Sequence, residues 1–174
     1  MGVSCAVITS AYGRQSQGTV RLHLLDLPVS QYGVDMADHT DDLRLAHILA
    51  DDADSLTMSR FGARDLTVST KPDHSEVTDA DLAVEDSVRR TLSRMRSRDA
   101  VHGEERADTG DGPRRWIIDP IDGTANFLRG VPVWATLIAL SVEDQIVASV
   151  VSAPALKRRW WAARGSGAWS GKSL

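Results

Sequence analysis

The residues best suited to chemistry stand together in the string D-P-I-D-G-T-A-N-F at residues 119–127. Two carboxylates in it, Asp119 and Asp122, come directly after the short apolar run at residues 116–118. We therefore expect both carboxylates at the carboxyl end of a buried strand, where α/β folds commonly bind ligands. Carboxylate oxygens are the ligands that a hard cation such as Mg²⁺ prefers.

The remainder of the string suits an anion. Gly123 lets the backbone approach a ligand closely, and the residues after it can open a helix whose N–H groups suit a phosphate. A cation-binding site next to an anion-binding site is what a metal-assisted phosphatase requires. A bare Asp-x-x-Asp would more simply be a turn with a helix cap, but the nine-residue string is too restrictive for that explanation.

The string resembles the first signature of the inositol monophosphatase family, which includes sugar phosphatases and a histidinol-phosphatase branch. Gly103-Glu104-Glu105 stands upstream, where the family has a G-E-E loop, and residues 77–81 (V-T-D-A-D) resemble its V-T-x-x-D segment. The resemblance runs from about Asp41 to the C-terminus. It implies an α+β, layered sugar-phosphatase fold of which this chain holds the N-terminal part, with two helices packed on an antiparallel sheet.

The resemblance also implies roles for individual residues. It places Mg²⁺ on four groups: Glu104, Asp119, Asp122 and the backbone carbonyl of Ile121. Catalysis falls to Glu104, Thr124 and Asp81, which would polarise and position the attacking water, with Lys71 nearby. The substrate contacts implied are Ile121, Asp122, Gly123 and Thr124, with the phosphate on the N–H groups of the last two. The implied reaction is hydrolysis of a phosphomonoester by metal-activated water.

Three of these residue groups have a plainer alternative, which the sequence leaves open. Glu104-Glu105 taken alone is a solvated acidic loop. Thr78-x-x-Asp81 is also a capping box, so Asp81 could serve to start a helix. Thr124 is also a natural helix N-cap.

Two tracts, residues 129–136 and 152–163, resemble the histidinol-phosphatase branch and imply histidinol phosphate as the substrate, in histidine biosynthesis. Inositol 1-phosphate or another sugar phosphate is the alternative. Ala125 departs from the branch, where a lysine or another polar residue is usual. Trp160 and Trp161 must point to opposite faces of a strand, so one of them could be core and the other cover.

The family continues into a second half with a W-D-x-A segment whose aspartate completes the second metal site, and no Trp-Asp pair occurs in this sequence. A third hypothesis is therefore an inactive metal-binding fragment. We expect the chain alone to hydrolyse phosphate esters poorly. A homodimer that supplies the carboxylate in trans is the alternative, and an uncovered edge at Ala168-Trp169 would favour association.

The elements that must position these residues follow from periodicity. Apolar residues at helical spacing predict helices over Asp41–Arg60 and from just after Thr78 to Met95. Two β-rich runs at 133–142 and 145–152 predict a hairpin, and 158–163 with 168–169 predict another. The poorly patterned residues 1–39 are expected to be an extension of a domain over residues 40–174.

The amino-acid composition limits the kinds of binding partner that the chain is expected to have. A net charge of −4 and a pI near 5.7 argue against a nucleic-acid-binding protein. No apolar run reaches the ~18 residues of a membrane span, and the single cysteine, Cys5, fits a reducing cytoplasm. The arginine pairs, such as Arg158-Arg159, are expected on solvated faces. The expected partner is a small phosphate ester.

Overall fold

The computed structural model describes residues 39–72 and 74–173. The predicted extension over residues 1–39 therefore lies outside the described residues except for His39, and it stays a prediction. No helix within the described ranges is long and apolar enough to cross a membrane.

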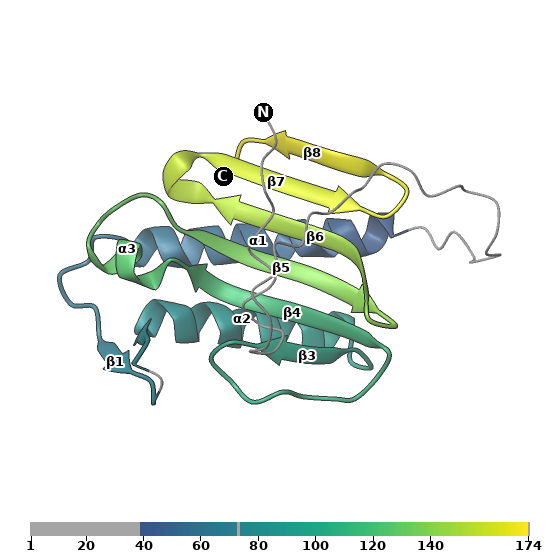
Figure 1. The fold of residues 1–174 in the computed structure, drawn as a ribbon, viewed down its shortest axis with the longest axis horizontal. Helices are drawn as coiled ribbons and strands as arrows, with labels where there is room; N and C mark the ends of the chain where they lie inside the picture. The colour runs from purple at the N-terminus through teal and green to yellow at the C-terminus, as the bar shows by residue number, and fades with distance from the viewer. Residues whose placement is uncertain (1–38, 73, 174) are drawn as a thin grey trace, which may run out of the picture. The chain divides into compact units, whose positions relative to one another are not determined.

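Both predicted long helices are confirmed. They are α1 (Thr40–Arg60) and α2 (Asp79–Met95), and a short third helix, α3 (Thr124–Leu128), follows the D-P-I-D string. Figure 1 shows α1 and α2 side by side on one face of a large sheet. Their buried residues recur every three or four positions, so each helix turns one apolar stripe toward the strands.

The large sheet has six strands in the order β3-β4-β5-β6-β7-β8. They are β3 (Ala100–Gly103), β4 (Arg114–Asp122), β5 (Ala135–Val142), β6 (Gln145–Ala153), β7 (Arg158–Ala163) and β8 (Gly167–Gly171), with a 3-10 turn at Pro154–Leu156. A separate hairpin pairs β1 (Val68–Thr70) with β2 (Glu76–Thr78). The two predicted hairpins are confirmed as β5–β6 and β7–β8, and with the helices they make the predicted layered α+β fold.

One strand pair departs from the antiparallel pattern. β3, which the sequence did not predict, runs parallel to β4, while every other neighbouring pair in the large sheet is antiparallel. The four residues A-V-H-G are too few to show an alternation that a sequence pattern could detect. The parallel pairing matters for the site, because it brings the carboxyl ends of β3 and β4 to the same edge of the sheet.

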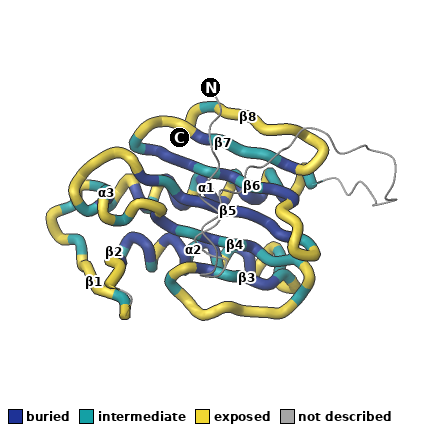
Figure 2. Tube along the Cα trace, viewed as in Figure 1, coloured by how far each residue is buried: buried dark blue, intermediate teal, exposed yellow. Residues whose placement is uncertain are grey.

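The core lies between the helices and the sheet. Its largest members on the strands are Trp116, Ile138 and Leu140, which face Leu49 and Val84 of the helices. Figure 2 shows this as dark blue along the central strands, whereas β1 and β8 are exposed. A smaller cluster under α3 joins Ile121, Phe127 and Trp134 to partly buried Phe61.

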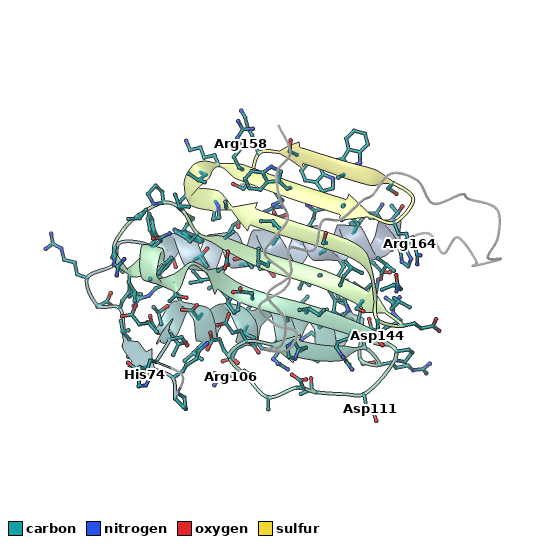
Figure 3. The ribbon with its side chains drawn as sticks, in the orientation of Figure 1. His74, Arg106, Asp111, Asp144, Arg158 and Arg164 are labelled. Carbon is teal, nitrogen blue, oxygen red and sulfur yellow. The ribbon has the colours of Figure 1, made fainter. Side chains whose placement is uncertain are left out.

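The prediction that Arg158-Arg159 lies on a solvated face is wrong for Arg159. Arg158 projects outward (Figure 3), but Arg159 is 5% exposed. Its guanidinium donates to Asp51 at 2.6 Å, to Asp54 at 2.7 Å and to the Ser152 hydroxyl at 3.0 Å. The carboxylates of α1 thus compensate a buried charge, which a sequence pattern of charges cannot reveal because the partners are about a hundred residues away.

Candidate metal and phosphate site

Strand pairing places Glu104 next to Asp119. In the parallel ladder Gly103 lies opposite Ile118, and the N–H of Glu104 donates to the Ile118 carbonyl at 3.2 Å. Glu104 is the first residue after β3 and Asp119 the first after Ile118, so the two lie side by side where both strands approach their carboxyl ends. The family resemblance implied this proximity, and the parallel pairing supplies its structural reason.

A β-bulge brings Asp119 and Asp122 to the same face of β4. Residues three apart on a regular strand point to opposite faces. Here Asp119 lies opposite Leu137 and Asp122 opposite Ala135, with a register shift between them. Since Leu137 and Ala135 are two residues apart and share a face, their partners share that face as well. The Thr136 hydroxyl donates to the Pro120 carbonyl at 2.8 Å inside the bulge.

The carboxylates at this edge destabilise one another's charge. Burial is the first cause that raises the pKa of Asp119, to about 9, followed by repulsion from Glu104 and Asp122. Burial and then repulsion from Glu104 also raise the pKa of Asp122. A cation bound among these groups would remove the repulsion.

The donor set suits Mg²⁺, although its members are not arranged as a finished coordination shell. Asp119 Oδ1 is buried and accepts no hydrogen bond, which leaves a carboxylate oxygen available to a cation. Across the described ranges, however, no three acidic, His or Cys side chains enclose a space ready for a metal ion. One oxygen of the Glu104 carboxylate, Oε1, accepts from Lys71 Nζ at 2.8 Å, and the carboxylate also lies within hydrogen-bonding reach of Asp119.

A buried residue that sequence reasoning missed supports the G-E-E loop. Glu85 of α2 is 0% exposed and accepts from the N–H of Glu105 at 2.7 Å and from Arg89 Nε at 2.8 Å. A Cβ on Gly103 would lie 2.0 Å from Glu85 Oε1, so any side chain there would displace the Glu85 carboxylate. The signal in the sequence was the acidic residue on the helix's apolar stripe, next to Val84 and Val88.

The alternative that Thr124 is a helix N-cap is wrong. The N-cap of α3 is Gly123, and Thr124 is the first residue of the helix. The Thr124 hydroxyl donates to the Ile121 carbonyl at 3.0 Å, so it lies among the groups assigned to the site. Gly123 has φ +92°, and a Cβ there would lie 3.2 Å from the Val133 carbonyl, so the close chain approach requires glycine.

The alternative that Asp81 caps a helix is confirmed. Asp81 Oδ2 accepts from the Thr78 N–H at 2.8 Å, while the Thr78 hydroxyl accepts from the N–H groups of Ala80 and Asp81. Burial, opposed by the Thr78 hydrogen bonds, raises the pKa of Asp81, and the charge of Glu104 adds to the rise. Asp81 therefore starts α2 within electrostatic reach of Glu104, and its part in catalysis stays a prediction.

Comparison with known proteins decides the family. The sequence profile of the Inositol monophosphatase family matches residues 39–173. The chain belongs to the inositol monophosphatase family. A solved member, the extragenic suppressor protein suhB from Bartonella henselae, superposes with a TM-score of 0.73 at 33% identity, over 77% of this chain and 53% of that one.

The relatives of this chain include two proteins that are named histidinol-phosphatase. The one from Streptomyces coelicolor is 61% identical over 143 residues, which make up 80% of this chain and 54% of the relative. The one from Mycobacterium tuberculosis is 62% identical over 131 residues, 75% of this chain and 50% of the relative. The chain thus spans about half the length of the curated relatives it matches.

The two tracts that suggested the histidinol-phosphatase branch are partly buried: residues 129–133 and 156–158 are exposed, whereas Trp134 and Trp161 pack against the fold. Trp134 is 3% exposed and packs against Phe61 and Phe127, with ring centroids 5.5 and 5.0 Å away. Trp161 packs edge-on against His47 of α1 at 5.0 Å. Trp134 therefore stabilises the cluster under α3 beside the site, and Trp161 stabilises the main core.

Proposed function

We propose that this chain provides the metal-binding and phosphate-binding half of a Mg²⁺-dependent phosphomonoesterase. The observation that carries the proposal is the convergence of Glu104, Asp119 and Asp122 on one edge of the sheet, where mutual repulsion and burial raise the pKa of Asp119 to about 9. Such a cluster is costly unless a cation binds to it. Mg²⁺ would supply there a Lewis acid that activates water and neutralises charge on the phosphoryl group.

Each of the site residues has a definite role in this proposal. Glu104, Asp119, Asp122 and the Ile121 carbonyl hold the metal. The Thr124 hydroxyl, kept in place by its 3.0 Å hydrogen bond to the Ile121 carbonyl, orients the attacking water. Asp81 supports that hydrogen-bond network, and Glu104 helps to polarise the water. The N–H groups of Gly123 and Thr124 bind the phosphate oxygens.

Histidinol phosphate is the substrate that we propose. The support is the identity of 61% and 62% to two relatives named histidinol-phosphatase. A relative named inositol-1-monophosphatase, from Mesorhizobium japonicum, is 41% identical over 117 residues, so an inositol or sugar phosphate is the second candidate. Both substrates offer the same phosphate, and discrimination must come from groups that contact the alcohol.

Those groups would lie largely in the half of the relatives that this chain does not match. We propose that the binding partner is a small phosphate ester rather than a nucleic acid or a membrane, and that the protein acts in the cytoplasm. In the family, the aspartate of a W-D-x-A segment completes the second metal site, and this sequence contains no Trp-Asp pair. A chain with this half alone would therefore hydrolyse phosphate esters slowly.

The test is a chimera that joins residues 39–173 to the remaining half of the Streptomyces coelicolor relative. Phosphate release from histidinol phosphate and from inositol 1-phosphate is measured in Mg²⁺ for the chimera, for its Asp119→Asn variant and for the 174-residue chain. We expect turnover by the chimera, a higher kcat/KM for histidinol phosphate, and a loss of at least about 10²-fold in Asp119→Asn.

A chimera that folds but hydrolyses neither ester, or an Asp119→Asn variant that retains full turnover, contradicts the metal mechanism. A higher kcat/KM for inositol 1-phosphate contradicts the substrate assignment and leaves the mechanism intact. Turnover by the 174-residue chain at an ordinary enzymatic rate of about 1–10³ s⁻¹ would favour a homodimer that completes the site in trans.

A further inference from the structure

Lys71 occupies a position between two adjacent carboxylates of the candidate site. Its Nζ lies 2.8 Å from Glu104 Oε1 and 2.8 Å from Glu105 Oε1. The contact joins the turn after β1 to the loop after β3, where His74 and Arg106 mark the two segments in Figure 3. A single ammonium therefore already offsets part of the negative charge of Glu104 and Glu105.

The two carboxylates hold Lys71 in unequal environments. The Glu105 side chain is 4% exposed, and its N–H is fixed to buried Glu85 at 2.7 Å. The Glu104 side chain is 46% exposed. Glu105 is thus a fixed anchor for the ammonium, whereas Glu104 has room to change rotamer.

The Lys71 backbone is fixed as well. Its N–H donates to the Ser75 carbonyl at 2.8 Å, and its carbonyl accepts from the His74 N–H at 2.9 Å. These bonds close the turn of the β1–β2 hairpin, so the ammonium is presented to the site from a defined position. Lys71 can keep its bond to Glu105 when Glu104 leaves.

We propose that Lys71 competes with the metal for Glu104. The inference rests on the proposed metal site. In the structure the ammonium occupies Glu104 Oε1 while the same carboxylate lies within hydrogen-bonding reach of Asp119. A divalent cation must therefore displace Lys71 from that oxygen in order to bind Glu104 fully. Glu105 retains the displaced ammonium close by, so the exchange is reversible and sets how much metal is needed to fill the site.

Competition predicts that neutralising Lys71 tightens metal binding. Breaking a half-exposed ion pair costs up to about 1 kcal/mol, so the dissociation constant of the metal should fall roughly threefold to fivefold in Lys71→Met. Removing one positive charge near the site would also tighten binding at long range. That contribution is screened in 0.5 M KCl, where the Debye length is roughly 4 Å.

The test is titration of the full chain with Mn²⁺, with free Mn²⁺ followed by electron paramagnetic resonance and reversal by excess Mg²⁺. We expect Lys71→Met and Lys71→Gln to bind more tightly than wild type in 0.5 M KCl, and Lys71→Arg to bind no more tightly. Lys172→Met removes the same charge next to β8, four strand spacings or about 19 Å from β4, and should leave the affinity unchanged. Thermal unfolding shows that each variant is folded.

A double-mutant cycle separates the two proposals. If Lys71 acts through Glu104, the gain from Lys71→Met disappears in a Glu104→Gln background. A gain that persists there, or no gain in either folded Lys71 variant while Asp119→Asn still weakens binding, refutes the competition and leaves the metal site standing. Absence of Mn²⁺ binding in wild type and in both Lys71 variants refutes the metal site, and the competition with it.

Discussion

At the scale of single residues, the site depends on side chains that touch no ligand. Glu85 is buried against Gly103, where a side chain would displace its carboxylate, and it accepts from the N–H of Glu105. The loop that presents Glu104 therefore takes its position from helix α2 as well as from its own strand. This support has an energetic cost, because a buried carboxylate needs every partner it has.

The first prediction concerns that carboxylate. Glu85→Ala should lower the free energy of unfolding by about 3–5 kcal/mol, since it removes one partner of a buried ion pair and leaves the N–H of Glu105 unsatisfied. Glu85→Gln is the comparison variant: its amide oxygen can still accept from Glu105 but its NH2 group then faces Arg89, so it should cost less than Glu85→Ala and more than nothing. Urea unfolding followed by circular dichroism measures both. Equal losses in the two variants would show that the hydrogen bond to the Glu105 N–H is unimportant.

The second prediction concerns pH. Burial alone would raise the pKa of Asp42, but hydrogen bonds from Arg114 and His39 outweigh it, and the net pKa is below the usual value. A depressed pKa in the folded state means that Asp42 contributes its full stabilisation above the unfolded value of about 3.9 and loses it as the pH falls through the lower folded value.

Asp42→Asn should therefore destabilise the chain at pH 7, and its deficit relative to wild type should shrink as the pH is lowered from about 4 toward 2. Urea unfolding across this range measures the deficit at each pH. Asp111→Asn, in an exposed loop at the edge of the structure (Figure 3), controls for the general effect of losing one carboxylate. A deficit that stays constant with pH would contradict the assigned role of Asp42.

At the scale of secondary structure, the bulge in β4 aligns the two aspartates of the string. It inserts one extra residue between Asp119 and Asp122 opposite Thr136, whose hydroxyl closes the bulge on the Pro120 carbonyl. The sequence predicted that the two carboxylates act together but contained no sign of how, since a strand without a bulge would separate them onto two faces.

The third prediction follows from this hydrogen bond. Thr136→Val keeps the side chain's shape and removes the hydroxyl, so the free energy of unfolding should fall by about 1 kcal/mol. Mn²⁺ binding should weaken by about tenfold, because loss of a hydrogen bond that supports a metal-binding group typically lowers metal affinity by about that factor. Thr136→Ser retains the hydroxyl and is the control. Unchanged Mn²⁺ affinity in a folded Thr136→Val variant would show that the bulge holds its shape without this bond.

Sequence periodicity predicted the helices and the antiparallel hairpins because each repeats a pattern over many residues. It did not predict β3, whose four residues carry no period, or the buried network of Arg159, whose partners lie far away in the chain. The site residues could be proposed from a local string. The family resemblance placed Lys71 near the site, but its ion pair with Glu104 was not predicted. Neither was Glu85 under Glu105, since both contacts join distant segments of the chain.

At the scale of the whole described domain, the two edge strands of the large sheet, β3 and β8, differ. β3 is protected, because Thr109 of the following loop exchanges two backbone hydrogen bonds with Val101. β8 has β7 on one side, and among the residues that the structure describes no strand pairs with its other side. Its central residue, Trp169, is 60% exposed. An apolar, unpaired edge strand is a template for pairing with another chain.

The last prediction is that the chain self-associates through β8. Sedimentation velocity at increasing concentration should show a growing dimer fraction, and Trp169→Lys should shift the chain to monomer, because a charged side chain on an edge strand opposes pairing. Ile146→Lys, which places the same charge at a 42% exposed position on β6, should leave the association unchanged. If Trp169→Lys associates as wild type does, the contact lies elsewhere. A site completed in trans could then not depend on β8, and Glu104, Asp119 and Asp122 would have to meet any partner carboxylate across another surface.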